Sequence, residues 1–165
     1  MKSAKYFILW AVIAVIKAHA ENRELIGRVV HVVDGDTLDV LVDNSQLFRV
    51  RLNGMDAPEK SQAFGSASKR SMMQMTLLKT ARVIWVKHDR NKRIVGKVMI
   101  GQKDVGLSLI SEGLAWHFKR YQVDQSAVDR QLYSSAEELS RRLRRGLWSQ
   151  PNPIPPWEFR SRTRK

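Results

Sequence analysis

The strongest constraint on the fold is a repeated alternation of apolar and polar residues in the first third of the chain. In residues 38–42 and 48–52 every second side chain is apolar, which is the period of a β-strand with one face against a core. Residues 25–33 are rich in β-branched side chains and indicate a further strand before them. The turn sequences Asp34-Gly35-Asp36 and Asp43-Asn44-Ser45 separate the three segments. We therefore expect three antiparallel strands joined by short turns, with Arg49 and Arg51 together on the face opposite the core.

The rest of the chain alternates between helical and strand patterns. Residues 62–79 place apolar side chains three and four positions apart, which predicts a helix with one buried face. Two more strands are expected at 82–88 and 94–100, a short helix from Asp104 to Gly113, and a longer helix over 128–143. This order fits a mainly β fold with α: a five-stranded antiparallel barrel of the OB-fold type with about three helices packed on it.

Both ends of the chain differ in composition from the middle. Residues 1–20 have a positive start, an apolar run of 11 residues from Tyr6 to Ile16 and the small-residue site Ala18-His19-Ala20, which together predict a cleaved signal peptide. The run is far shorter than the ~20 residues that span a bilayer, so no stable membrane insertion is expected after cleavage. We expect export to the periplasm or the medium, a single OB-fold domain over 21–149 that acts as a monomer, and an extended, basic, proline-rich tail over 150–165.

Charge and cysteine content limit the classes of function. The chain has no cysteine, which excludes disulfides, thiolate metal sites and a cysteine nucleophile. Its formal net charge is +13, of which the three lysines in the first twenty positions contribute +3, so residues 21–165 keep a net charge of +10 and the basic character belongs to the folded part. Such a charge favours polyanionic partners, of which nucleic acid comes first and an anionic membrane surface second.

Three short stretches concentrate charged residues. They are DGDT at 34–37, RLNGMDAPE at 51–59 and DRNKR at 89–93. Each has a purely structural alternative when taken alone: an ordinary turn, a pair of helix caps and a solvated loop. Together they contain what phosphodiester hydrolysis requires. Aspartates supply oxygen ligands for a hard cation, a glutamate can orient or deprotonate water, and arginines match phosphate oxygens with two parallel donors.

The three stretches, in this order, resemble the staphylococcal nuclease (thermonuclease) family. The resemblance spans residues 25–148, and the segments GLAWHFKRY and PPWEFR are similar to bacterial members. It implies an OB-fold barrel, dependence on Ca²⁺, and cleavage of DNA and RNA to products that end in 3′-phosphates. It further implies that Asp36 and Asp56 bind calcium, that the backbone carbonyl of Ala57 completes the protein ligands, and that Asp34 lies just outside the ligand set.

The resemblance also assigns the residues that act on the substrate. Arg51 and Arg93 match the two phosphate-binding arginines, and Glu59 matches the glutamate that acts on the attacking water. One departure concerns the second arginine, which the family commonly places after a tyrosine and a glycine. Here Asn91 and Lys92 occupy those positions, so the tyrosine contact to a terminal phosphate is missing, and Lys92 or Arg90 is expected to replace it electrostatically.

The main alternative is an OB-fold protein that binds nucleic acid without cutting it. Such a protein needs a basic groove and aromatic side chains on which bases stack, and the chain offers four candidates: Trp85, Trp116, Phe118 and Tyr121. However, a pure binder gains nothing from carboxylates beside its phosphates, since like charges repel. Asp36, Asp56 and Glu59 therefore favour the enzyme.

Overall fold

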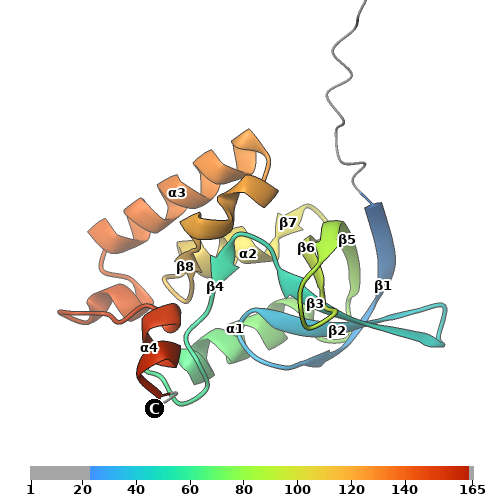
Figure 1. The fold of residues 1–165 in the computed structure, drawn as a ribbon, viewed down its shortest axis with the longest axis horizontal. Coiled ribbons are helices and arrows are strands. Elements are labelled where there is room, and N and C mark those ends of the chain that lie inside the picture. The colour runs from blue at the N-terminus through green and yellow to red at the C-terminus, as the bar shows by residue number, and fades with distance from the viewer. Residues whose placement is uncertain (1–22, 164–165) are drawn as a thin grey trace, which may run out of the picture.

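The computed structural model describes residues 23–163, which contain eight strands, four α-helices and two 3₁₀ segments (Figure 1). The strands are β1 (Arg23–Val32), β2 (Thr37–Val42), β3 (Gln46–Leu52), β4 (Met55–Asp56), β5 (Thr80–His88), β6 (Ile94–Ile100), β7 (Lys103–Asp104) and β8 (Trp116–His117). The helical segments are α1 (Gly65–Thr76), α2 (Val105–Ser111), η1 (Lys119–Asp124), α3 (Ala127–Arg142), η2 (Gly146–Ser149) and α4 (Pro156–Thr163). No helix within residues 23–163 is long and apolar enough to cross a membrane.

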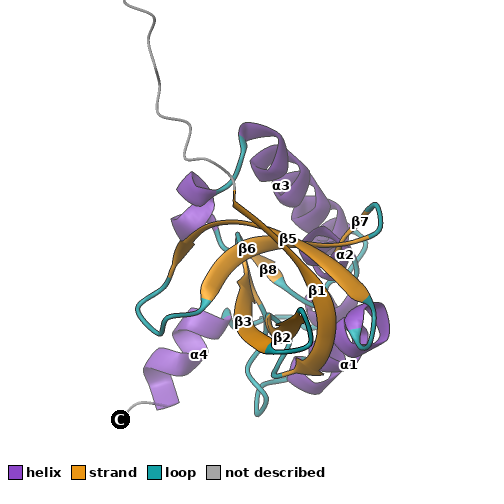
Figure 2. Ribbon diagram, turned by 90° about the vertical axis from the view of Figure 1, so that its right-hand side faces the viewer, coloured by secondary structure: helices purple, strands orange, loops and turns teal. Residues whose placement is uncertain are grey.

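Five strands close into a barrel, which confirms the predicted fold. The sheet runs in the order β3-β2-β1-β5-β6, with β7 added beyond β6, and all of these neighbours are antiparallel. A parallel pairing of β3 with β6, in which Val50 lies opposite Ile94, closes the barrel (Figure 2). The small pair β4–β8 lies outside this sheet. Closure leaves the barrel strands with little unpaired edge.

Local sequence explains the turns around the barrel. Asp43 and Asn44 have φ of 48° and 55°, a left-handed conformation that Asp and Asn tolerate and that suits the twist of a tight hairpin between β2 and β3. Asp104 caps α2, since its carboxylate accepts a hydrogen bond of 3.1 Å from the backbone N–H of Leu107. Both features agree with the sequence-based expectations.

The core fills the barrel and extends beneath two helices. Its centre is apolar and fully buried, and α1 contributes Met72 while α2 contributes Leu109 and Ile110. A second cluster lies near the C-terminal end of the chain. It contains Trp116, Leu147 and Trp148, with Phe64 and Trp157 packed against it.

The C-terminal tail differs from the sequence-based expectation. An extended strap is wrong for residues 156–163, which form the helix α4 beside the segment that joins β4 to α1 (Figure 1). Pro156 suits the first turn of a helix because its missing N–H and fixed φ cost nothing there. The expected signal peptide at residues 1–20 lies outside the described residues, and the boundaries 21–149 and 150–165 stay predictions.

Candidate active site

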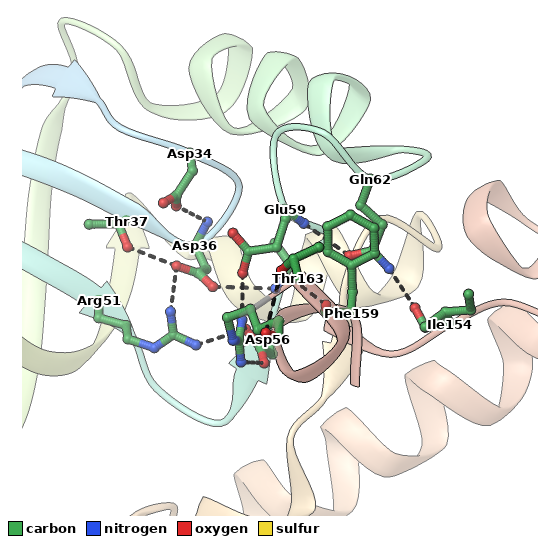
Figure 3. A network of polar contacts seen from close by, with 12 residues as sticks. Asp34, Asp36, Thr37, Arg51, Asp56, Glu59, Gln62, Ile154, Phe159 and Thr163 are labelled. Carbon is green, nitrogen blue, oxygen red and sulfur yellow. Dashed lines mark hydrogen bonds and ion pairs between the residues drawn. The ribbon is translucent and has the colours of Figure 1, made fainter. Parts of the chain in front are cut away.

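The register of β2 and β3 brings the first two charged stretches together. Thr37 lies opposite Arg51, and the backbone N–H of Leu52 donates to the carbonyl oxygen of Asp36 at 2.8 Å. Since side chains alternate along a strand, Arg51 points away from the core residues Val50 and Leu52 and toward the turn that carries Asp36 (Figure 3).

Arg51 bridges two buried carboxylates. Its Nη1 lies 2.7 Å from Oδ1 of Asp36, and its Nη2 lies 2.9 Å from Oδ1 of Asp56. The side chain of Asp56 is fully buried and that of Asp36 is 6% exposed, whereas Arg51 retains 19% exposure. Arg51 thus donates a hydrogen bond to Asp56 and forms an ion pair with Asp36, so one guanidinium links the two carboxylates. Among residues 23–163, Arg51 therefore pairs with two buried acids and not with acids on the surface.

Asp36 lies at the centre of a local hydrogen-bond network. Its Oδ1 accepts from Thr37 Oγ1 at 2.7 Å, its Oδ2 accepts from the backbone N–H of Ala57 at 3.3 Å, and its own N–H donates to Asp34 Oδ1 at 3.0 Å. Burial opposes the charge of Asp36, but Arg51 and these donors outweigh it and lower the pKa of its carboxyl. Burial and the neighbouring Asp36 raise the pKa of Asp34 to about 6.

Glu59 comes from the loop between β4 and α1 and reaches the same carboxylates through an unexpected partner. Arg160 of α4 donates to Glu59 Oε1 from Nη1 at 2.6 Å, and to Asp56 Oδ2 from Nη2 at 2.6 Å. Its Nη1 also lies 3.2 Å from Asp56 Oδ1. Sequence reasoning gave Arg160 no place in the site. The one available signal was the ending PPWEFR, whose last residue is this arginine.

Arg93 lies at the edge of the site. Its Nε donates to Asp89 Oδ2 at 2.8 Å, and its Nη1 lies 3.4 Å from Thr37 Oγ1, the hydroxyl that bonds to Asp36. Asp89 also accepts from the backbone N–H groups of Asn91 and Arg93, so this aspartate shapes the loop. The structure thus gathers Asp34, Asp36, Arg51, Asp56, Ala57 and Glu59 in one place and brings Arg93 to its border.

The chemistry of the donor set fits a hard divalent cation. Among residues 23–163, no three acidic or histidine side chains are arranged to enclose a metal ion. Nevertheless, the carboxyl groups of Asp34, Asp36, Asp56 and Glu59 face only the guanidinium groups of Arg51 and Arg160, which leaves an excess of negative charge. Burial is the main cause of the raised pKa of Asp34, and the nearby carboxylate of Asp36 adds to it. A divalent cation would relieve the excess of negative charge, and oxygen ligands are those that calcium prefers.

Comparison with known proteins places this geometry in a family. Residues 49–150 match the family described as Staphylococcal nuclease homologue, a range that includes Arg51, Asp56, Glu59 and Arg93. The chain is 39% identical over 143 residues to a micrococcal nuclease of Shigella flexneri, with 81% of this chain and 79% of the relative covered. It is 36% identical over 137 residues to an uncharacterized endonuclease of Escherichia coli, with 82% and 85% covered.

A third relative covers more of the chain. The protein ParB of Escherichia coli is 35% identical over 172 aligned positions, which include 97% of this chain and 94% of the relative. The similarity therefore extends past the segment that the family description covers and includes the sequence on either side of it. The chain belongs to the staphylococcal nuclease family of hydrolases.

Proposed function

We propose that the protein is a calcium-dependent endonuclease that hydrolyses phosphodiester bonds of DNA and RNA by attack of water. One observation carries the proposal. Asp36, in the turn before β2, and Asp56, in β4, both place buried carboxylates against the guanidinium of Arg51. A fold that needed only stability has little reason to bury two acids around one base, because desolvation offsets most of the attraction.

The carboxylates would serve as ligands. Asp36, Asp56 and the backbone carbonyl of Ala57 would hold the calcium, which when bound polarises the phosphate and neutralises its charge. Asp34 would not be a ligand. Its carboxyl accepts from the backbone N–H of Asp36 and so holds the turn on which the ligand is carried.

Three side chains would act on the substrate. Glu59 would orient the attacking water or take its proton. Arg51 uses Nη1 and Nη2 for the two aspartates, but a guanidinium has five N–H groups, so donors remain for a phosphate oxygen. Arg93 would bind the phosphate from the edge of the site. Negative charge grows on the phosphate as water attacks, and preorganised donors stabilise that charge.

The expected substrates follow from charge and from the relatives. A net charge of +13 favours a polyanion, and two relatives are named a nuclease and an endonuclease. The alternative function, binding of nucleic acid without cleavage, has the aromatic side chains in its favour: Phe118 and Tyr121 form an edge-to-face pair with ring centroids 5.0 Å apart. The buried carboxylates favour the enzyme, because they would weaken a simple binder.

The decisive experiment is a cleavage assay on the protein without its first twenty residues. Plasmid DNA, single-stranded DNA and RNA are each incubated with calcium, with magnesium or with excess chelator. We expect all three substrates to be cut in calcium and none in chelator. Robust cleavage in chelator would refute the calcium assignment, and tight binding without cleavage under every condition would establish the alternative.

Export is a separate part of the proposal. We expect cleavage between Ala20 and Glu21 and release of a monomer into the periplasm or the medium, since a short apolar run precedes the Ala-His-Ala site. Mass spectrometry of the protein from its host gives the N-terminal residue. A mature species that begins at Met1 would support a membrane anchor instead, and sedimentation of the cleaved protein gives its oligomeric state.

A further inference from the structure

The helix α4 brings a second guanidinium, that of Arg160, to the carboxylates beside Arg51. Arg160 contacts both oxygens of Asp56, at 3.2 and 2.6 Å, and Oε1 of Glu59 at 2.6 Å. Arg160 is 104 residues away from Asp56 along the chain. Such a distant residue reaches the site only because α4 is held in one place.

Aromatic packing holds α4 there. The ring of Trp157 stacks on Phe118 with centroids 4.9 Å apart and planes 15° apart, and it meets Trp116 edge to face at 5.6 Å. Trp116 lies directly opposite Asp56 in the β4–β8 pair. Trp116, against which Trp157 of α4 packs, is therefore paired in the β4–β8 ladder with Asp56, and Arg160 contacts the carboxylate of Asp56. Trp157 precedes Arg160 by three positions, about one turn of the helix, so the two side chains project to the same side.

A second anchor lies just before the helix. Gln62 Nε2 donates to the carbonyl oxygen of Ile154 at 2.6 Å, and Gln62 Oε1 accepts from the backbone N–H of Glu59 at 3.1 Å. One glutamine side chain thus links the entry to α4 with the loop that carries Glu59 (Figure 3). The placement of Glu59 and the placement of α4 depend on each other.

The carboxylate of Glu59 depends on Arg160 for its orientation. Within residues 23–163, Arg160 is the one side chain that pairs with it. A glutamate side chain in an exposed loop would otherwise sample several rotamers, at a cost in entropy whenever it is ordered. Arg160 removes that freedom before substrate arrives.

The way in which Arg160 is occupied indicates what it does. Its Nη1 and Nη2 make three contacts with carboxylate oxygens, against two for Arg51, so Arg160 has fewer donors left for a phosphate than Arg51 has. A carboxylate offers about four lone-pair positions, and Asp56 uses three of them, one for Arg51 and two for Arg160. A position for a cation remains, so Arg160 and a bound metal are compatible.

We propose that Arg160 is a positioning residue of the active site, which fixes the Glu59 carboxylate relative to the ligand Asp56 and makes α4 part of the catalytic unit. The proposal rests on the function proposed above, in which Glu59 acts on water and Asp56 binds calcium. It predicts that a variant in which residue 160 cannot contact Glu59 and Asp56 at the same time has lower turnover, while its affinities for substrate and metal stay nearly the same.

The test compares Arg160→Lys with Arg162→Lys. Arg162 is on the same helix, 62% exposed, and its nearest acid is Glu158 at 3.5 Å, so the control makes the same chemical change away from the site. Lysine keeps the charge but cannot donate through two nitrogens to both acids. We expect kcat of Arg160→Lys to fall about 10²-fold, the cost of a small misplacement of a reacting group. KM should change less than about threefold, and Arg162→Lys should match the wild type.

Two further readouts separate this role from others. Calcium affinity of Arg160→Lys, measured by calorimetry without substrate, should equal that of the wild type. Turnover of Arg160→Ala should be partly restored by millimolar guanidinium, which can occupy the vacated position. A rise in KM with unchanged kcat would make Arg160 a phosphate ligand and overturn the proposal. Tighter calcium binding with higher activity in Arg160→Lys would make it an internal competitor of the metal, which also overturns it.

Failure of this inference and failure of the proposed function are distinguishable. Calcium dependence of the wild-type protein decides the proposed function without any variant. If the wild type is calcium-dependent and Arg160→Lys retains full turnover, only the role of Arg160 is wrong. If Arg160→Lys is unfolded by circular dichroism, the guanidinium rescue of Arg160→Ala decides the question.

Discussion

Thr37 lies directly opposite Arg51 in the antiparallel ladder of β2 and β3. A slip of one residue in this register would turn Arg51 toward the core and remove it from both aspartates. Two positions earlier, on the same face, Arg49 lies opposite Asp39 and donates to its carboxylate at 2.8 Å. The strand therefore carries two arginines on one face: Arg51, 19% exposed beside Asp36 and Asp56, and Arg49, 53% exposed beside Asp39.

These two arginines give a matched pair of variants. Arg51→Lys keeps the charge beside Asp36 and Asp56 but loses the planar pair of donors. We expect kcat to fall about 10²–10³-fold, the usual cost of losing one preorganised donor, with DNA affinity close to that of the wild type. Arg49→Lys should retain turnover, because Arg49 contacts Asp39 and neither Asp36 nor Asp56. Steady-state kinetics beside a binding titration in chelator measures both quantities.

Equal turnover in the two lysine variants would remove Arg51 from the reaction. A loss of DNA affinity as large as the loss of turnover would instead make Arg51 a ground-state ligand of the substrate. Circular dichroism must first show that Arg51→Lys is folded, because Arg51 is the shared partner of two buried carboxylates.

Asp36→Asn tests the metal assignment through stability. Asparagine preserves the shape of the side chain but removes the anionic ligand, so calcium should no longer bind to the folded state. In the wild type, calcium at a hundredfold excess over its Kd should stabilise the protein by about 2.7 kcal/mol. We expect the thermal midpoint of Asp36→Asn to be insensitive to calcium and its cleavage activity to be lost. Asp43→Asn, in an exposed turn, serves as the control.

His117 should contribute an acid-sensitive part of the stability. It is 3% exposed, and burial lowers the pKa of its imidazole, although its ring nitrogen bonds to Gln125 Oε1 at 3.0 Å. The unfolded chain therefore binds the proton more readily than the folded one. This stability is complete above the unfolded pKa of about 6.5 and is lost as pH falls below it toward the lower folded value.

The variant His117→Gln isolates that contribution. Its free energy of unfolding should depend less steeply on pH between 7 and 5 than that of the wild type, as measured by urea unfolding at several pH values. His88→Gln changes an exposed histidine and should keep the wild-type slope. A slope in His117→Gln equal to that of the wild type would assign the acid sensitivity to other groups.

The barrel could be predicted from the sequence because its strands are long enough to show their period. Every second residue is apolar in 38–42 and 48–52, within β2 and β3, and this pattern correctly placed Arg49 and Arg51 on one face. The pair β4–β8 could not be predicted, since each strand has only two residues and no period. Yet this pair positions Asp56 opposite Trp116.

The helix α4 was missed for a different reason. Its eight residues are too few to form a helix alone, and four prolines after Gln150 favour an extended chain. What orders it is the packing of Trp157 on Phe118 and Trp116, a contact across about forty residues that no local pattern reveals. The role inferred for Arg160 therefore depended on tertiary structure, whereas Arg51 could be inferred from alternation and resemblance.

Lys92 shows how a departure from the family pattern acts on the backbone. It occupies the position at which the family commonly has glycine, and its φ is 61°, in the left-handed region. A residue with a Cβ pays about 1–2 kcal/mol in that conformation. Lys92→Gly should therefore raise the free energy of unfolding by up to about 1 kcal/mol, because the more flexible unfolded chain offsets part of the gain.

Lys92→Ala removes the same charge and keeps the strain, so it should not be stabilised. Both variants lose one exposed cation, and their DNA affinities should fall equally. Urea unfolding beside a binding titration separates the two effects: a stability gain shared by Gly and Ala would mean that charge repulsion with Arg90 or Arg93, and not the backbone, is the cause.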